Sequence, residues 1–229
     1  LPADPFIDFA CGTNGGPPSR PLTDWTGFAE CRAEAASGFH EVYFQYDNEL
    51  EYVSKARGLV TQAALYQYTS AYEIPVVASA LFDQNGFYVG LRLITDPRVP
   101  VALREKGSAL GNFLMARYGE GWACQDLPHL PGEQPYLGAL IKRACTLSVP
   151  NEDAVITLEM HQFRKAGQGP IDLGNNLPTE GQFESSTRFE MLLDGGVENG
   201  AQLAAEIAAR PPPGPITSAV KPAGRSTSW

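Results

Sequence analysis

Alternation of hydrophobic and polar residues dominates this chain and predicts β-strands in several segments. The clearest case is PVVASALFDQNGFYVGLRLITD, residues 75–96, where two alternating runs flank Asn85-Gly86. Asn-Gly is preferred in hairpin turns whose two central residues both need a positive φ. The pattern therefore predicts a β-hairpin with its turn at Asn85-Gly86.

The same period of two predicts further hairpins on either side of this one. Short turn segments, Ser37-Gly38 in the first hairpin and PNED in the second, separate the expected strands. The expected strands cover residues 28–36 and 39–53 in the first hairpin, and residues 136–149 and 154–164 in the second.

A last strand is expected in FESSTRFEMLL, residues 183–193, where apolar and charged residues alternate. Such a pattern predicts one buried and one solvated face. The expected inward residues are Phe183, Thr187, Phe189 and Met191, and the expected outward residues are Glu184, Arg188 and Glu190.

Helical periodicity is confined to the segments between these strands. Residues 99–119 place Leu103, Leu110 and Leu114 on one stripe after a Pro97 start, which predicts an amphipathic helix that covers a sheet face. A second helix is expected near residues 199–209, and residues 54–73 give only a weak helical signal. The order of strands, helix, strands and helix favours an α+β fold of antiparallel hairpins.

The cysteines suggest a tandem duplication. Cys11 and Cys31 lie 20 positions apart and Cys124 and Cys145 lie 21 apart, and FAC before the first pair resembles WAC before the second. An offset of 114 also aligns the alternating residues 41–53 with residues 155–167. We therefore expect two related modules around a pseudo-twofold axis, although coincidence between two ordinary hairpins explains the same matches.

The expected modules are residues 1–119 and 120–210, followed by a Pro-, Gly- and Ser-rich arm at residues 211–229. Four cysteines allow three disulfide connectivities. Within two modules the economical pairing is Cys11 with Cys31 and Cys124 with Cys145. The main rival pairs Cys31 with Cys145 across the pseudo-twofold axis.

Charge and cysteine content restrict the compartment and the partners. A net charge of −9 disfavours nucleic acid, and no apolar run reaches the roughly 20 residues of a membrane span. An even number of cysteines favours disulfides and hence a periplasmic or secreted protein, while four free thiols in a cytosolic protein are the alternative. The start LPADPFIDFACG has no initiator Met and resembles a mature end, left either by processing or by the choice of the expressed sequence, and removal of a signal peptide is a hypothesis.

Candidate chemistry is sparse, because the common catalytic and phosphate-binding motifs are absent from the sequence. Glu159 and His161 are spaced to share one strand face, and the expected duplication places Asp47 where the other module has His161. If the two faces meet, Asp47, Glu159 and His161 form a carboxylate–imidazole cluster for hydrolysis or proton transfer. The alternative is the polar side of a sheet. No cofactor and no metal site is predicted.

Tyrosine is concentrated in the first half, where seven of the nine tyrosines lie between residues 43 and 88. Amphipathic rings suit contact surfaces, although tyrosine is also a common strand residue. Tyr43, Tyr46, Tyr52 and Tyr88 are the binding candidates. The function expected from the sequence is binding of a partner protein or a small polar ligand, with a carboxylate–histidine enzyme as the alternative.

Overall fold

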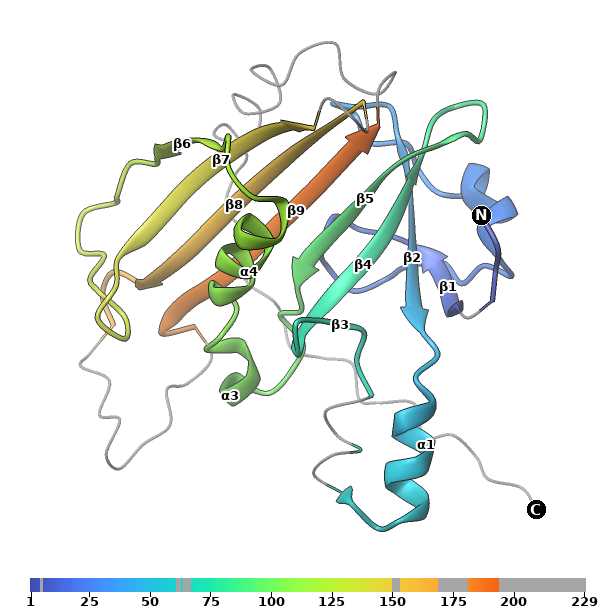
Figure 1. Ribbon diagram of the computed structural model, residues 1–229, viewed down its shortest axis with the longest axis horizontal. Coiled ribbons are helices and arrows are strands. Elements are labelled where there is room, and N and C mark those ends of the chain that lie inside the picture. Colours follow the sequence, from blue (N-terminus) through green and yellow to red (C-terminus); the bar gives the residue numbers. More distant parts are fainter. Residues whose placement is uncertain (5, 61–62, 64–66, 150–152, 169–180, 194–229) are drawn as a thin grey trace.

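The computed structural model describes residues 1–4, 6–60, 63, 67–149, 153–168 and 181–193. Their strands form one nine-stranded antiparallel sheet in the order β1-β2-β4-β5-β9-β8-β7-β6, with the short β3 paired to β4 (Figure 1). The strands are β1 (Phe6–Cys11), β2 (His40–Tyr46), β3 (Ser70–Ala71), β4 (Ile74–Phe82), β5 (Tyr88–Thr95), β6 (Ala123–Asp126), β7 (Ile141–Val149), β8 (Ala154–Arg164) and β9 (Phe183–Leu193). The helices of the described residues are η1 (Trp25–Glu30), α1 (Glu49–Ala56), α3 (Val101–Arg104) and α4 (Ala109–Tyr118).

The predicted α+β fold of two strand-and-helix modules is wrong. Strands β1, β2, β4 and β5 form one meander, β6 to β9 form another, and pairing of β5 with β9 joins them into a single sheet. The helices are short additions to this sheet. Each meander alone would leave the outward backbone groups of its last strand, β5 or β9, unpaired. Pairing of β5 with β9 satisfies the groups of both strands.

The residue alignment behind the expected duplication equates strands in different positions. Residues 41–46 belong to β2, which is second from its edge of the sheet, whereas residues 155–164 belong to β8, which is third from the opposite edge. Cys145 lies inside β7, but Cys31 lies outside any strand at the end of η1. Matching alternation arose because strands of the same period look alike wherever they lie in a sheet.

The expected boundary between residues 119 and 120 falls in the connection from α4 to β6. Hydrogen bonds between β5 and β9 cross between the two parts of the chain that this boundary separates. The helix expected near residues 199–209 and the arm at residues 211–229 lie outside the described residues. Within the described residues, no helix has both the length and the apolar content that a membrane crossing requires.

Both disulfides have the pairing that the spacing favoured. Cys11, the last residue of β1, is bonded to Cys31, which follows η1 directly. Cys124 of β6 is bonded to Cys145 of β7, which lies opposite it in the strand register. The first disulfide thus holds η1 against the sheet, and the second holds the edge strand β6.

The predicted hairpin of residues 28–36 and 39–53 does not exist. β2 pairs instead with β1 and β4, and the segment before it contains the 3-10 helix η1. Asp24 caps this helix by accepting a hydrogen bond from the backbone N–H of Thr26. The cap and the burial of Trp25 favour a helical turn over a strand.

The β4–β5 hairpin is confirmed, but its turn is longer than predicted. Of Asn85 and Gly86 only Gly86 has a positive φ, at 86°. The connection runs from Asp83 to Phe87, and Oδ1 of Asp83 accepts hydrogen bonds from the backbone N–H groups of Asn85 and Phe87. The aspartate side chain therefore organises a loop in which only the glycine needs the left-handed conformation.

The helix predicted over residues 99–119 covers the sheet as expected but is divided into α3 and α4. A Cβ atom on Gly107, between the two helices, would lie 2.1 Å from the backbone oxygen of Ser185 in β9. β9 also caps α4, since Ser185 and Thr187 accept hydrogen bonds from the backbone N–H groups of Ser108 and Gly111. Close approach to β9 thus requires a glycine at position 107, in the segment between the two helices.

α4 and η1 cover the same face of the sheet. Leu110 and Leu114 of α4 are buried, as predicted, over apolar residues of β7, β8 and β9. Trp25 of η1 packs over β1, β2 and β4 in a second apolar cluster. The cores beneath the two helices meet at Leu93 of β5, which contacts both clusters.

The opposite face of the sheet combines small apolar clusters, such as Leu81 with Leu192, with charged residues, and it is not the solvated face that the β9 pattern predicted. Glu190 is only 3% exposed and Arg92, its partner on β5, only 1%. Glu34, from the loop before β2, reaches over this face to Arg92, and Gly15 packs against Ile94 of β5. Loops of the N-terminal region therefore bury charged side chains that the sequence pattern assigns to solvent.

Candidate functional site

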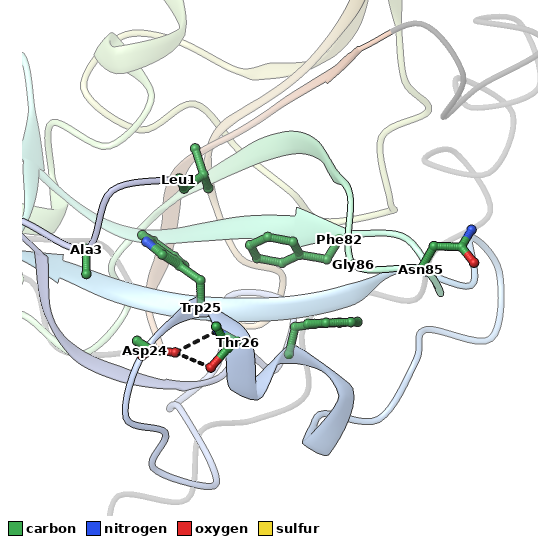
Figure 2. A pocket seen from close by; sticks show the side chains of 9 residues that line it. Leu1, Ala3, Asp24, Trp25, Thr26, Phe82, Asn85 and Gly86 are labelled. Atoms are coloured by element: carbon green, nitrogen blue, oxygen red, sulfur yellow. Dashed lines mark hydrogen bonds between the residues drawn. The ribbon is translucent and has the colours of Figure 1, made fainter.

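A hollow of about 370 Å³ lies beside η1, on the helix-covered side of the first meander (Figure 2). It is formed where three segments meet: the start of the chain, the first turn of η1 and the β4–β5 turn. Its volume lies within the usual range of small-ligand sites. The lining residues are Leu1, Ala3, Asp24, Trp25, Thr26, Phe28, Phe82, Asn85 and Gly86.

Three aromatic rings form the apolar wall of the hollow. The ring centroids of Trp25 and Phe82 are 6.2 Å apart, and those of Phe28 and Phe82 are 5.7 Å apart. Trp25 is held further by edge contacts with Phe9 and Phe44 at 4.6 and 5.2 Å. The wall is therefore part of a packed aromatic cluster and is formed before any ligand arrives.

The position of each aromatic ring is fixed by its backbone. Trp25 and Phe28 are three residues apart in η1, so both project from the same side of that helical turn. The indole N–H of Trp25 donates to the backbone oxygen of Pro2 at 3.0 Å. Gly86 lies so close to the Phe28 ring that a Cβ atom there would be 2.7 Å from a ring carbon.

Asp24 supplies a charged group at the edge of the hollow. Its Oδ1 accepts two hydrogen bonds, one from the hydroxyl of Thr26 at 2.5 Å and one from the backbone N–H of Thr26 at 2.7 Å. These bonds, the hydroxyl bond foremost, lower the pKa of Asp24 and so favour the ionised carboxylate. The hollow thus combines an aromatic wall with a negative charge, which suits binding.

The four candidate tyrosines do not form one surface. Tyr43 is 3% exposed and lies under the Arg98 guanidinium, whereas Tyr46 and Tyr52 are about half exposed near α1. Tyr88 is half-buried against Phe82, on the aromatic cluster beneath the hollow, and burial raises its pKa. Tyr88 is therefore the candidate that belongs to the neighbourhood of the hollow.

The structure brings Glu159 and His161 together and leaves Asp47 apart. Nε2 of His161 lies 3.0 Å from Oε1 of Glu159 on the polar face of β8, although without hydrogen-bond geometry. Asp47 follows β2, and β4, β5 and β9 separate β2 from β8. A strand spacing of about 4.8 Å puts these two strands about 19 Å apart, so the three residues do not share one site.

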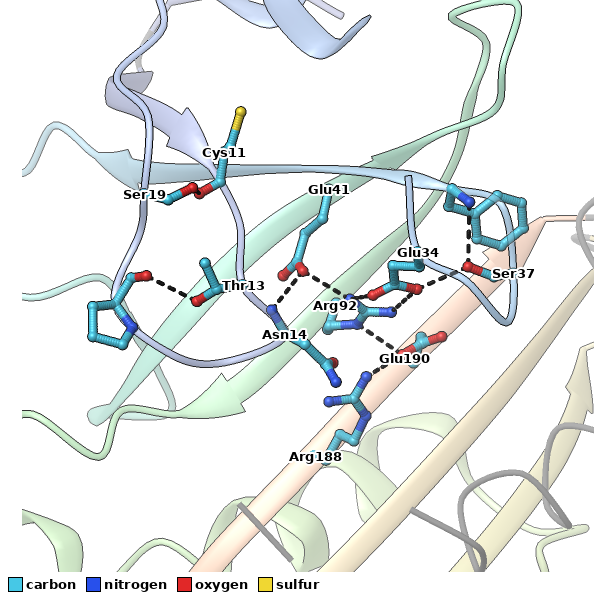
Figure 3. A network of polar contacts seen from close by, with 12 residues as sticks. Cys11, Thr13, Asn14, Ser19, Glu34, Ser37, Glu41, Arg92, Arg188 and Glu190 are labelled. Atoms are coloured by element: carbon cyan, nitrogen blue, oxygen red, sulfur yellow. Dashed lines mark hydrogen bonds and ion pairs between the residues drawn. The ribbon is translucent and has the colours of Figure 1, made fainter. Parts of the chain in front are cut away.

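A buried ion cluster occupies the polar face of the sheet, and Figure 3 shows Glu34, Glu41 and Glu190 converging on Arg92. Arg92 donates from Nε to Glu190 at 2.9 Å and from its terminal nitrogens to Glu34. These carboxylates raise the pKa of Arg92 against the opposing effect of burial. Arg188 also pairs with Glu190 at 2.9 Å, whereas Oε1 of Glu41 is buried without a hydrogen-bond partner in the described residues. The cluster therefore joins strands and loops through ion pairs.

Sequence reasoning missed the hollow. The available signal was the segment TDWTGF, in which Asp24 precedes a helical turn that carries Trp25 and Phe28 on one side. No local sequence pattern indicated that the β4–β5 turn would form the other end of the hollow.

The described residues contain no cluster suited to a metal ion, and no known protein matches the chain. Within the described ranges, no group of three or more His, Cys, Asp or Glu side chains is arranged to hold a metal ion. Comparison with known protein families, curated protein sequences and solved structures found no match for the chain.

Proposed function

We propose that this protein is a binding protein of an oxidising compartment outside the cytoplasm, and that its ligand occupies the hollow beside η1. The observation that carries the proposal is the aromatic wall of Trp25, Phe28 and Phe82 next to the carboxylate of Asp24. Apolar walls with a few placed polar groups are typical of small-ligand sites.

The rigidity of the hollow supports this proposal. Cys31 ends η1 and is bonded to Cys11, and Trp25 is packed on several sides by other aromatic rings. A preformed site loses little conformational entropy when a ligand binds. Dependence of the site on a disulfide also links it to an oxidising environment, periplasmic or extracellular, where such bonds persist.

Binding is favoured over catalysis because the polar groups of the hollow already have structural roles. Asp24 and Thr26 cap η1 through their mutual hydrogen bonds. The alternative enzyme would depend on Glu159 and His161 alone, since Asp47 lies on another part of the sheet.

The test is titration of the isotope-labelled protein with indole and with p-cresol, followed by NMR of the Trp25 indole N–H and the Asn85 and Gly86 amides. We expect saturable shifts at these signals. Phe28→Ala removes one ring of the wall and should weaken binding about tenfold. Phe113→Ala, which removes a 48% exposed ring on α4, is the matched control and should not change binding.

Two outcomes would contradict the proposal. Shifts that map away from the hollow would assign binding to another surface. Equal affinities of wild type and Phe28→Ala would show that the aromatic wall does not contact the ligand.

A further inference from the structure

The chemistry of the hollow also indicates which class of ligand it selects. Building on the proposed function, we infer that the site binds a small organic ammonium ion, with its apolar body against Trp25 and Phe28 and its positive charge beside Asp24. The inference rests on the charges around the hollow, on the free oxygen of Asp24 and on the aromatic faces.

The side chains that line the hollow carry only negative charge. Asp24 is the ionisable one, and none of the described lining residues is Lys, Arg or His, so the α-amino group of Leu1 is the positive group of the lining. Arg20, on a neighbouring loop, is paired with Glu30 at 2.5 Å and is thus already neutralised. Asp83 adds a second carboxylate in the adjoining turn, and the whole chain carries a net charge of −9. The two carboxylates outnumber the one amino group, so a cation is attracted both at long range and at the site.

Both nearby carboxylates stay ionised. The Thr26 hydrogen bonds lower the pKa of Asp24. At Asp83 desolvation is the largest single effect and raises the pKa, but the hydrogen bonds from Phe87, Asn85 and Gly86 together outweigh it and the net shift is downward. The negative potential at this end of the molecule therefore persists at mildly acidic pH.

Only one oxygen of Asp24 is used by the fold. Oδ1 accepts both hydrogen bonds from Thr26, and in the described part of the chain Oδ2 accepts none. An ammonium group at Oδ2 would gain a charge-assisted hydrogen bond without disturbing the cap of η1. Oδ1 of Asp24 therefore caps the helix, and Oδ2 is left to bind the ligand.

The aromatic wall suits the same ligand. Trp25 and Phe28 line the hollow, and a cation within about 6 Å of a ring centroid is attracted to the negative face of the ring. An apolar body next to the cation gains contact area with Phe82 and Leu1. A neutral polar ligand would lack this contact area, and the carboxylates would repel an anion. A small organic ammonium ion and a lysine side chain of another protein share this chemistry. The small size of the hollow favours the small organic ion.

The test compares four ligands by isothermal titration: benzylammonium, benzyl alcohol, benzoate and the N-acetyl-N′-methylamide of lysine. We expect benzylammonium to bind about fivefold more tightly than benzyl alcohol and benzoate to bind most weakly. Added NaCl should weaken only the cations, because screening acts on charge. Tighter binding of the lysine derivative than of benzylammonium would overturn the free small molecule as the ligand.

Asp24→Asn is the decisive variant. Asparagine also caps helices well, so η1 should persist, as thermal unfolding can verify. We expect this change to bring the affinity for benzylammonium down to the affinity for benzyl alcohol. Asp126→Asn, at an exposed carboxylate on β6, is the matched control and should keep the preference.

The outcomes separate this inference from the proposed function. If benzyl alcohol binds in the hollow as tightly as benzylammonium, the ammonium specificity is wrong and the binding function stands. If none of the ligands binds there, the proposed function fails together with the inference.

Discussion

Arg92 of β5 and Glu190 of β9 lie directly opposite each other where the two meanders join, and Nε of Arg92 donates to Oε2 of Glu190 at 2.9 Å. They are 98 residues apart in sequence and each is at most 3% exposed. Glu34 and Glu41 complete the environment of the guanidinium. One side chain thus joins both halves of the sheet and a loop that covers it.

Arg92→Met should be strongly destabilising, because it leaves Glu34, Glu41 and Glu190 without their shared counterion. We expect the free energy of unfolding in urea to fall by about 3–5 kcal/mol. Arg143→Met is the control, since Arg143 forms an exposed pair with Asp126 and should change stability by less than about 1 kcal/mol. Similar losses for the two variants would show that the buried cluster does not hold the sheet together.

Stability should fall in acid through Glu34. Burial raises the pKa of Glu34, but the hydrogen bond and charge of Arg92 outweigh burial, so the net shift is downward. A lowered native pKa stabilises the fold above the unfolded pKa of about 4.3, and this stabilisation is lost as the pH falls through the native pKa.

Urea unfolding between neutral pH and pH values below this range measures the effect. Glu34→Gln should be less stable than wild type at neutral pH, and the difference should shrink in acid. Glu30→Gln, whose carboxylate forms an exposed pair with Arg20, is the comparison. If the difference in unfolding free energy between wild type and Glu34→Gln did not depend on pH, Glu34 would not be the group that links stability to pH.

The two disulfides should have similar effects on stability and different effects on the hollow. They close loops of 20 and 21 residues, so replacing either pair by alanine should cost about 3 kcal/mol in the chain-entropy model. Cys11 and Cys31 hold η1, which carries Trp25 and Phe28. Removal of this pair should weaken binding of benzylammonium, while removal of Cys124 and Cys145 should not.

Thermal unfolding and titration of both double variants check this prediction. The binding measurement must be made well below the lower unfolding temperature, where both variants are folded. Equal loss of binding in the two variants would mean that overall stability, and not the position of η1, controls the hollow.

Gly107→Ala should destabilise the contact between the α3–α4 break and β9. The new Cβ atom would lie 2.1 Å from the backbone oxygen of Ser185, and backbone cannot move aside as a side chain can. We expect a loss of about 1–3 kcal/mol in the free energy of unfolding. Asn112→Ala on the exposed side of α4 should change it by less than about 0.5 kcal/mol. A neutral Gly107→Ala would show that α4 does not need this close approach.

Much of the local structure followed from the sequence. Alternation located β4, β5, β8 and β9, and the cysteine spacing indicated the observed disulfides. Leu110 and Leu114 were correctly assigned to the buried side of a helix. These features depend on periodicity and short-range geometry, which neighbouring residues specify.

The candidate site followed from the sequence only in part. The spacing of Glu159 and His161 predicted their contact, because residues two apart on a strand share a face. Their separation from Asp47 depends on the strand order, which no local pattern contains. The hollow was missed for the same reason, since Asp24 and Asn85 come together only when η1 packs beside the β4–β5 turn.

The sequence by itself determined where strands form and which of their residues alternate. Only the tertiary structure decided that β5 pairs with β9 and that the polar face between them is buried. The physical reason is that a strand edge offers the same backbone hydrogen bonds to any partner. Likewise, Arg92 and Glu190 occupy polar positions of their strands whether water or an opposite charge satisfies them, and the choice depends on segments far away in the chain.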